Sequence, residues 1–139
     1  MNKILIIDDE EYLCLALEKS LRQEGYQVAI ATRGEQGLEI IRNETPSLVI
    51  LDLKMPEMDG LEVLVKAKDI IPQLPIIMLT AHGTINTAIE ALKLGAVDYL
   101  TKPIDLDALK IIVEQALKIS RLQEEVIFLR TQLKYLKTE

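Results

Sequence analysis

The amino-acid sequence predicts an α/β fold: a doubly wound, five-stranded parallel sheet with helices on both faces and an extended C-terminal helix. Short apolar runs rich in β-branched residues alternate along the chain with segments of helical periodicity, which is the pattern of successive βα units. Polar residues stand where four of these runs end. Because ligands of parallel α/β sheets bind beyond the carboxyl ends of the strands, we expect these polar residues to share one pocket.

Each predicted strand is a run of four or five mostly apolar residues, which suits a strand buried on both faces. The runs are Lys3–Ile7, Gln27–Ala31, Leu48–Leu51, Ile76–Thr80 and Val97–Thr101.

The helices predicted between the strands end at residues that commonly terminate helices. In the first, about Glu10–Glu24, Leu13, Leu17 and Leu21 recur at helical spacing and Gly25 follows. The second begins near Gly34 and ends before Asn43, the third begins at Asp59–Gly60 and ends before Pro72, and the fourth spans about Thr84–Leu94 before Gly95.

The fifth predicted helix begins near Asp105 or Asp107, either of which could cap it, and it is unusually long. Neither Gly nor Pro occurs from Leu106 to Glu139, a stretch about three times the usual helix length. We therefore predict a compact domain over residues 1–118 and a helical linker over residues 119–139.

Composition excludes several classes of protein. A chain of 139 residues with 49% hydrophobic residues predicts a single folded domain. No apolar run is long enough for a membrane helix, and no signal-peptide pattern is present, so we expect no membrane association. The net charge of −6 argues against direct nucleic-acid binding. The single cysteine, Cys14, excludes an internal disulfide, suits the core and favours the cytoplasm, and His82 as the only histidine argues against a zinc site.

The polar residues at the strand ends predict a phosphoryl site. Converging carboxylates cannot all stay ionised unless a cation lies between them, and oxygen ligands favour Mg²⁺. Lys102 would add a positive charge and Thr80 a hydroxyl donor, so a phosphoryl group on Asp52 would be neutralised from several sides. Taken alone, Thr80 could be an ordinary strand residue and Lys102 a solvated residue at the edge of the sheet. Their occurrence together with the acidic residues favours the phosphoryl site.

This constellation resembles the receiver domain of two-component response regulators, over residues 1 to about 118. The resemblance rests on Asp8-Asp9, on Asp52-x-x-Met55-Pro56 with Gly60 following, on Thr80 and on Lys102-Pro103, in this order. It implies a (βα)₅ fold with strand order 2-1-3-4-5. It also implies a signalling switch, not a dedicated enzyme, that receives its phosphoryl group from a sensor histidine kinase.

The resemblance also implies a role for each site residue. Asp52 is the phosphoacceptor, and Thr80 and Lys102 bind the phosphoryl oxygens. The implied Mg²⁺ ligands are Asp9, Asp52 and the backbone carbonyl of Lys54, with Asp8 acting largely through water.

Further residues are implied to transmit or tune the signal. Tyr99 turns inward when Thr80 moves, although a half-buried strand aromatic would also fit its position. This movement changes the face formed by the fourth helix, fifth strand and fifth helix. Lys54 and His82 tune hydrolysis of the aspartyl phosphate, and the Lys102–Pro103 peptide bond is expected to be cis.

Within that family, the sequence is most similar to the nitrogen-regulator class, the receivers of sigma-54-dependent AAA+ activators. The similarity lies in residues 80–84, 88–93 and 95–103. The chain contains neither a P-loop motif nor a helix-turn-helix, so the output domain of such an activator is not in it. The chain is then either a fragment cut at the linker or a receiver that works alone.

Two other functions are alternatives to this interpretation. A haloacid dehalogenase-type phosphatase also uses an Asp nucleophile with Mg²⁺, but needs a second Asp two residues later, where this chain has Lys54. A pseudo-receiver would bind partners without phosphate, and the intact set of polar residues argues against it.

A heptad pattern in the C-terminal segment predicts a parallel two-stranded coiled coil. Position a holds Ile112, Ile119, Val126 and Leu133, and position d holds Gln115, Leu122, Leu129 and Leu136. Glu125 at g would face Arg130 at e of a second chain. We therefore expect a homodimer formed through residues 112–136, assisted by the face of the fourth helix, fifth strand and fifth helix. Ile127 and Phe128 lie outside this seam, which leaves open a helix that folds back on its own domain.

Overall fold

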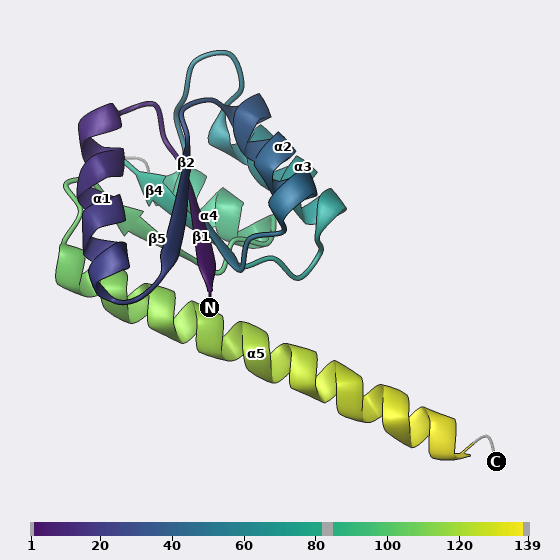
Figure 1. Cartoon of the computed structure of the whole chain (residues 1–139). Helices are drawn as coiled ribbons and strands as arrows, with labels where there is room; N and C mark the ends of the chain where they lie inside the picture. The colour runs from purple at the N-terminus through teal and green to yellow at the C-terminus, as the bar shows by residue number, and fades with distance from the viewer. Residues whose placement is uncertain (1, 82–84, 138–139) are drawn as a thin grey trace.

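The computed structural model describes residues 2–81 and 85–137. Strands and helices alternate strictly over these residues (Figure 1). The strands are β1 (Lys3–Ile7), β2 (Gln27–Ala31), β3 (Leu48–Asp52), β4 (Ile76–Thr80) and β5 (Asp98–Thr101). The helices are α1 (Glu11–Gln23), α2 (Gly34–Glu44), α3 (Gly60–Ile70), α4 (Ile85–Lys93) and α5 (Leu106–Lys137).

The five strands form one parallel sheet in the order β2-β1-β3-β4-β5. The predicted fold class and strand order are therefore confirmed. Two strand limits differ from the prediction by one residue, since β3 includes Asp52 and β5 begins at Asp98. Among the helices, α1 is one residue shorter at each end, α4 ends one residue earlier at Lys93, and α2 continues through Asn43 to Glu44.

Alternate residues of each strand contribute to two separate cores, one on each face of the sheet. On one face, α1 and α5 cover Ile4, Ile6 and Ile50 with residues such as Leu17 and Val113. On the other face, α2, α3 and α4 pack side chains that include Leu38, Leu64 and Ala91 on Leu5, Ile7, Val49 and Leu51. Every residue of β3 and β4 is buried, as expected for central strands covered on both faces.

Several helix ends follow the sequence signals. Gly25 adopts a φ of 94°, and its N–H donates to the Arg22 carbonyl while the Tyr26 N–H donates to the Leu21 carbonyl. This is a Schellman motif, which needs a left-handed residue that glycine provides without steric cost. At the start of α5, the Asp105 side chain accepts from the Asp107 N–H at 2.9 Å, so Asp105 is the capping residue of the two candidates.

Helix α5 continues far beyond the sheet as a single straight element (Figure 1). Its last buried residue is Leu117, and all residues from 121 to 136 are exposed. The described helices include none with the length and apolar character needed to span a membrane.

Candidate functional site

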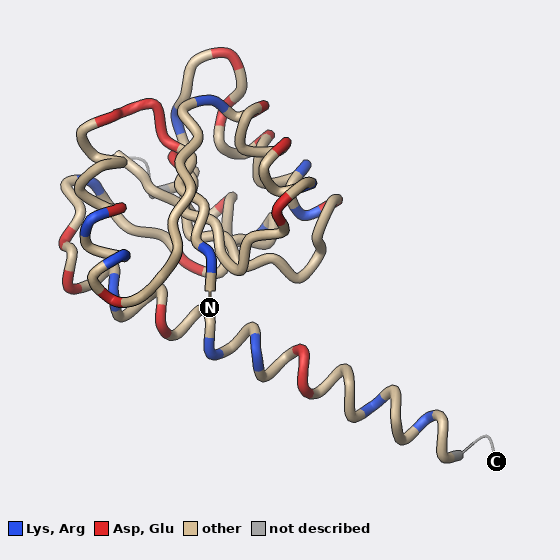
Figure 2. Tube along the Cα trace, viewed as in Figure 1, with Lys and Arg blue, Asp and Glu red and all other residues tan. Residues whose placement is uncertain are grey.

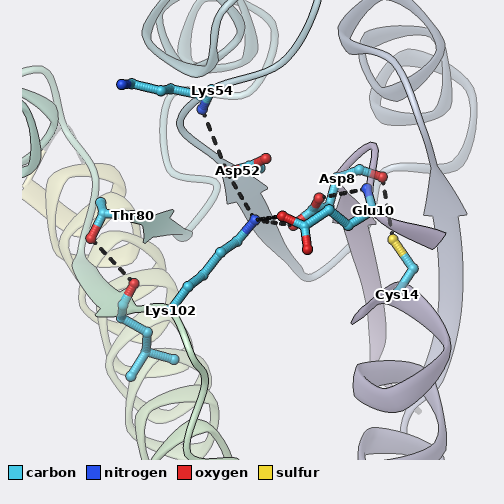
Figure 3. Close-up of polar contacts among 8 residues, drawn as sticks. Asp8, Glu10, Cys14, Asp52, Lys54, Thr80 and Lys102 are labelled. Atoms are coloured by element: carbon cyan, nitrogen blue, oxygen red, sulfur yellow. Dashed lines mark hydrogen bonds and ion pairs between the residues drawn. The ribbon is translucent and has the colours of Figure 1, made fainter. Parts of the chain in front are cut away.

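Four strands bring polar side chains to the same edge of the sheet (Figure 3). Asp8 follows β1, Asp52 ends β3, Thr80 ends β4 and Lys102 follows β5. Asp8, Asp52 and Thr80 are buried, with exposed fractions of 0%, 5% and 2%. Buried polar groups of this kind destabilise a fold unless they are paired, so the pairing around them defines what the site can do.

The backbone around Asp52 is held in place by the start of α3. The Gly60 N–H donates to the Leu53 carbonyl at 2.8 Å. A Cβ at Gly60 would lie 2.3 Å from the Asp52 carbonyl oxygen and 2.7 Å from the Leu53 Cα, so only glycine allows this approach. Asp59 caps α3 by accepting from the Glu62 N–H at 2.9 Å, which fixes the helix start beside the strand end.

Lys102 is the positive centre of the site. Its Nζ lies 3.1 Å from Asp8 Oδ2, 3.4 Å from Asp52 Oδ1 and 2.9 Å from Glu10 Oε1 (Figure 3). One ammonium group therefore contacts three carboxylates. The Lys102–Pro103 peptide bond is cis, and the Lys102 N–H donates to the Thr80 carbonyl at 2.7 Å.

Glu10 is a site residue that the sequence did not single out. It was predicted as the first residue of a helix, but it is the N-cap residue of α1 with extended backbone. Its N–H donates to Asp8 Oδ1 at 2.9 Å. The only available signal was the unbroken acidic stretch from Asp8 to Glu11, visible between β1 and α1 in Figure 2.

Burial disfavours the ionised form of the two buried carboxylates, Asp8 and Asp52, and raises their pKa values. Burial raises the pKa of Asp52 to about 6, the charge of Asp8 raises it too, and Lys102 opposes both. Burial also raises the pKa of Asp8, against the opposing effects of the Glu10 N–H and Lys102. For Lys102, burial alone would lower the pKa, but the hydrogen bond to Glu10 and the charges of Asp8 and Asp52 raise it above its ordinary value.

The acidic groups fit a hard divalent cation. One carboxylate oxygen each from Asp8, Asp9 and Asp52 lies within 4.8 Å of the others. Asp8 Oδ2 is buried and accepts no hydrogen bond from the described residues, although it faces the Lys102 ammonium. The single Lys102 ammonium is shared among three carboxylates, so a bound cation would offset their remaining negative charge, and an all-oxygen donor set suits Mg²⁺. The Lys54 N–H donates to Asp52 Oδ1 at 3.4 Å, and the Lys54 side chain is exposed.

The other predicted residues have different surroundings. The Thr80 hydroxyl donates to the Leu100 carbonyl at 3.4 Å. Tyr99 is partly buried and packs against the core beneath α2, α3 and α4. His82 lies outside the described residues. Cys14 is buried in the core and its thiol donates to the Asp8 carbonyl at 3.3 Å; burial raises its pKa to about 12.

Comparisons with known proteins agree with this geometry. A family model described as "Response regulator receiver domain" matches residues 4–114. The transcriptional regulatory protein ZraR of Klebsiella oxytoca is 44% identical over 124 residues, which cover 89% of this chain and 28% of that protein. The crystal structure of NtrX from Brucella abortus in complex with ADP has a TM-score of 0.89 and 36% identity, over 93% of this chain and 30% of that one.

A shorter solved chain has a similar fold over nearly its whole length. A response regulator receiver domain protein from Clostridium thermocellum has a TM-score of 0.85 and 35% identity, over 88% of this chain and 99% of its own. The present chain spans less than a third of the length of ZraR. The likeness to NtrX confirms the predicted similarity to the nitrogen-regulator class.

Proposed function

The chain belongs to the response regulator receiver domain family, and we propose that it is a phosphorylation-dependent switch whose phosphoacceptor is Asp52. The observation that carries this proposal is the position of the Asp52 carboxylate, buried at the end of β3 with the Lys102 ammonium 3.4 Å away, which also contacts Asp8 at 3.1 Å. Family membership makes the chain a signalling domain, and the haloacid dehalogenase alternative is set aside. A sensor histidine kinase in the cytoplasm would be the donor.

In the proposed reaction, an Asp52 carboxylate oxygen attacks the phosphorus of a phosphohistidine. The new O–P bond forms as the N–P bond of the donor breaks, and the leaving imidazole nitrogen takes up a proton. With a pKa of about 6, Asp52 is mostly ionised at neutral pH and can act as the nucleophile. Lys102 would neutralise phosphoryl charge, and the Thr80 hydroxyl would donate to a phosphoryl oxygen.

Asp8, Asp9, Asp52 and the Lys54 carbonyl would hold Mg²⁺, whose charge stabilises the phosphoryl oxygens when it is bound. Lys54 and His82, each two residues beyond a phosphoryl-site residue, would tune the hydrolysis rate of the acyl phosphate.

The conformational change would run through Thr80 and Tyr99. When the Thr80 hydroxyl turns to the phosphoryl group, it releases the Leu100 carbonyl on the neighbouring strand. Tyr99, adjacent to Leu100 and only partly buried, would then turn inward and alter the face of α4, β5 and α5. Ile89 of α4 and Val97, which directly precedes β5, are 45% and 46% exposed, so these elements offer apolar surface to a partner.

We further propose that residues 119–139 form a linker that pairs two chains in a parallel coiled coil. The seam residues Ile119, Leu122, Val126 and Leu129 are 55%, 53%, 43% and 50% exposed, which a solitary helix in water would not favour. Three of them also line a groove of about 660 Å³ whose far wall includes Pro75 and Val97 of the domain. The domain of residues 1–118 would thus add contacts beside the seam.

The likeness to longer transcriptional regulators suggests the output. We propose that phosphorylation controls a sigma-54-dependent activator, whose ATPase lies outside this chain. The relatives extend well beyond the matched region, which supports this role.

The phosphoacceptor is tested by incubating the protein with acetyl phosphate and Mg²⁺ and recording its intact mass. One phosphoryl increment is expected, and it should vanish in Asp52→Ala or with a chelator. An increment that survives either change contradicts the assignment. If the wild-type protein never gains the increment, it is a pseudo-receiver. If it hydrolyses a phosphate ester with multiple turnover, it is a phosphatase of the haloacid dehalogenase type.

The dimer is tested by sedimentation and crosslinking. Truncation after Lys118 should weaken or abolish the dimer. In a Cys14→Ser background, Leu122→Cys at the seam should oxidise to a covalent dimer, whereas Glu124→Cys on the opposite side of the helix should not. A monomer in both experiments excludes the coiled coil, and a dimer without the Leu122→Cys crosslink excludes the parallel register.

A further inference from the structure

Glu10 is the closest carboxylate to the Lys102 ammonium and the most exposed of the three that contact it. The distance from Lys102 Nζ to Glu10 Oε1 is 2.9 Å, against 3.1 Å to Asp8 and 3.4 Å to Asp52. The Glu10 side chain is 59% exposed, whereas those of Asp8 and Asp52 are 0% and 7% exposed. Glu10 is therefore the solvent-exposed member of the three carboxylates that contact the ammonium.

A role in helix capping does not account for this side chain. Glu10 is the N-cap residue of α1, but its side chain makes no capping hydrogen bond. The contact with Lys102 joins residues 92 apart in the sequence and ties the β1–α1 connection to the end of β5. The Glu10 side chain is 59% exposed and its carboxylate still lies 2.9 Å from the ammonium, so we attribute its direction to attraction by Lys102.

We propose that Glu10 is a positioning residue that competes with the phosphoryl group on Asp52 for Lys102, and so limits the rate at which the site accepts phosphoryl groups. This inference rests on the proposed function of Asp52. The Lys102 ammonium has three N–H donors and already contacts three carboxylates, so an incoming phosphoryl oxygen would have to displace one of them, and Glu10 is the most exposed. Glu10 also adds negative charge at the solvent side of the site, where an anionic donor approaches.

Competition between Glu10 and the phosphoryl group for Lys102 predicts that phosphorylation becomes faster when the Glu10 charge is removed. Removing the Glu10 charge frees Lys102 for the phosphoryl oxygens and lessens repulsion of the donor. Loss of one unit charge a few ångströms from a charged ligand at a partly solvated site changes the rate by roughly three- to tenfold. The second-order rate constant for phosphorylation of Glu10→Gln by acetyl phosphate should rise by this factor.

The neighbouring residue supplies a matched control. Glu11 is exposed in the first turn of α1 and forms no ion pair with Lys102 among the described residues. Glu11→Gln removes the same charge one residue away and should change the rate by less than about twofold. Glu10→Asp keeps the charge but withdraws it by one methylene, so it should resemble Glu10→Gln if competition for Lys102 matters, and wild type if only the charge does.

A spectroscopic measurement separates positioning from a general effect on the fold. Beryllium fluoride with Mg²⁺ serves as a phosphoryl mimic, and ¹⁹F NMR reports the surroundings of its fluorines. Glu10→Gln and Glu10→Asp should shift a bound fluorine resonance, because Lys102 then pairs with the mimic alone, whereas Glu11→Gln should leave the spectrum unchanged.

The outcomes divide cleanly. Faster phosphorylation and a shifted resonance in both Glu10 variants, with Glu11→Gln like wild type, support the proposal. Three results would overturn the proposed role of Glu10 and leave the phosphoacceptor assignment intact. They are equal rates in Glu10→Gln and Glu11→Gln, slower phosphorylation of Glu10→Gln than of wild type, and wild-type behaviour of Glu10→Asp. If wild type itself gains no phosphoryl group, the proposed function fails, and the role of Glu10 fails with it.

Discussion

Replacing Asp52 by Asn should stabilise the metal-free protein, although Asp52 is the proposed centre of its function. Asp52 as a residue is 5% exposed, and burial raises the pKa of its carboxylate from 3.8 to about 6. Asparagine has nearly the same shape, carries no charge and keeps an oxygen that can accept from the Lys54 N–H. The substitution thus removes the strained charge with little loss of packing.

The pH dependence follows from the raised pKa. Because the folded protein binds the Asp52 proton more tightly than the unfolded chain, this group stabilises the fold most below about pH 3.8, and the contribution is lost as the pH rises through about 6. A shift of about two units corresponds to about 3 kcal/mol above that range. This value already includes the opposing attraction of Lys102, 3.4 Å away, so we expect a gain of about 1–3 kcal/mol at pH 8. The gain should be roughly halved at pH 5.

Urea denaturation followed by circular dichroism, with EDTA present, measures this difference at both pH values. Asp69→Asn, at an exposed position of α3, is the matched control and should change stability by less than about 0.5 kcal/mol. Adding Mg²⁺ should narrow the gap, because a ligand that binds only the folded wild type stabilises it. If Asp52→Asn is no more stable than wild type at pH 8, or if its advantage grows as the pH falls, the electrostatic account of the site is wrong.

Three further predictions test other parts of the structure. Thr80→Ala should leave Mg²⁺ affinity near wild type but weaken the response of residues 85–93 to beryllium fluoride in amide exchange, since Thr80 contacts β5 and is not one of the proposed metal ligands; equal responses in both proteins would contradict a role for Thr80 in the switch. Gly60→Ala should cost about 2 kcal/mol or more in denaturation, because the new Cβ would meet backbone atoms that cannot move aside; an unchanged midpoint would contradict this close approach. Cys14 should react with iodoacetamide at pH 8 far more slowly in the native protein than in urea, since burial raises its pKa to about 12, and rapid native labelling would contradict its placement in the core.

The sheet was predictable from the sequence because a buried parallel strand must be apolar on both faces. The runs before Asp8 and Asp52 contain almost no polar residue, so their limits and the residues after them could be read directly. Glycine positions were equally informative: Gly25 and Gly95 have φ values of 94° and 113°, and each ends a helix where expected. These signals are local, and local sequence was sufficient for them.

Contacts that depend on side-chain direction were less predictable. Glu10 looks like any acidic residue at the start of a helix, and its pairing with Lys102 appears only when the β1–α1 connection and the end of β5 meet in space. The limit of β3 was also placed one residue early, because an acid was expected to end the strand. Asp52 instead continues the ladder opposite Leu79, which places a charged group inside the sheet.

The packing of the sheet explains why the proposed conformational change would pass from the site to β5. The strands that carry Asp52 and Thr80 are central and wholly buried, so they hold the reacting groups in fixed positions. Strand β5 is the edge strand beside Thr80, spans only four residues and has no fully buried one. Rearranging it disturbs less packing than moving either central strand would, since the free energy of local movement falls with the amount of buried contact. The hydrogen bond from the Thr80 hydroxyl to the Leu100 carbonyl joins the rigid part to this more weakly held strand. A phosphoryl group that competes for that one hydroxyl would therefore act on the element of the sheet that resists movement least.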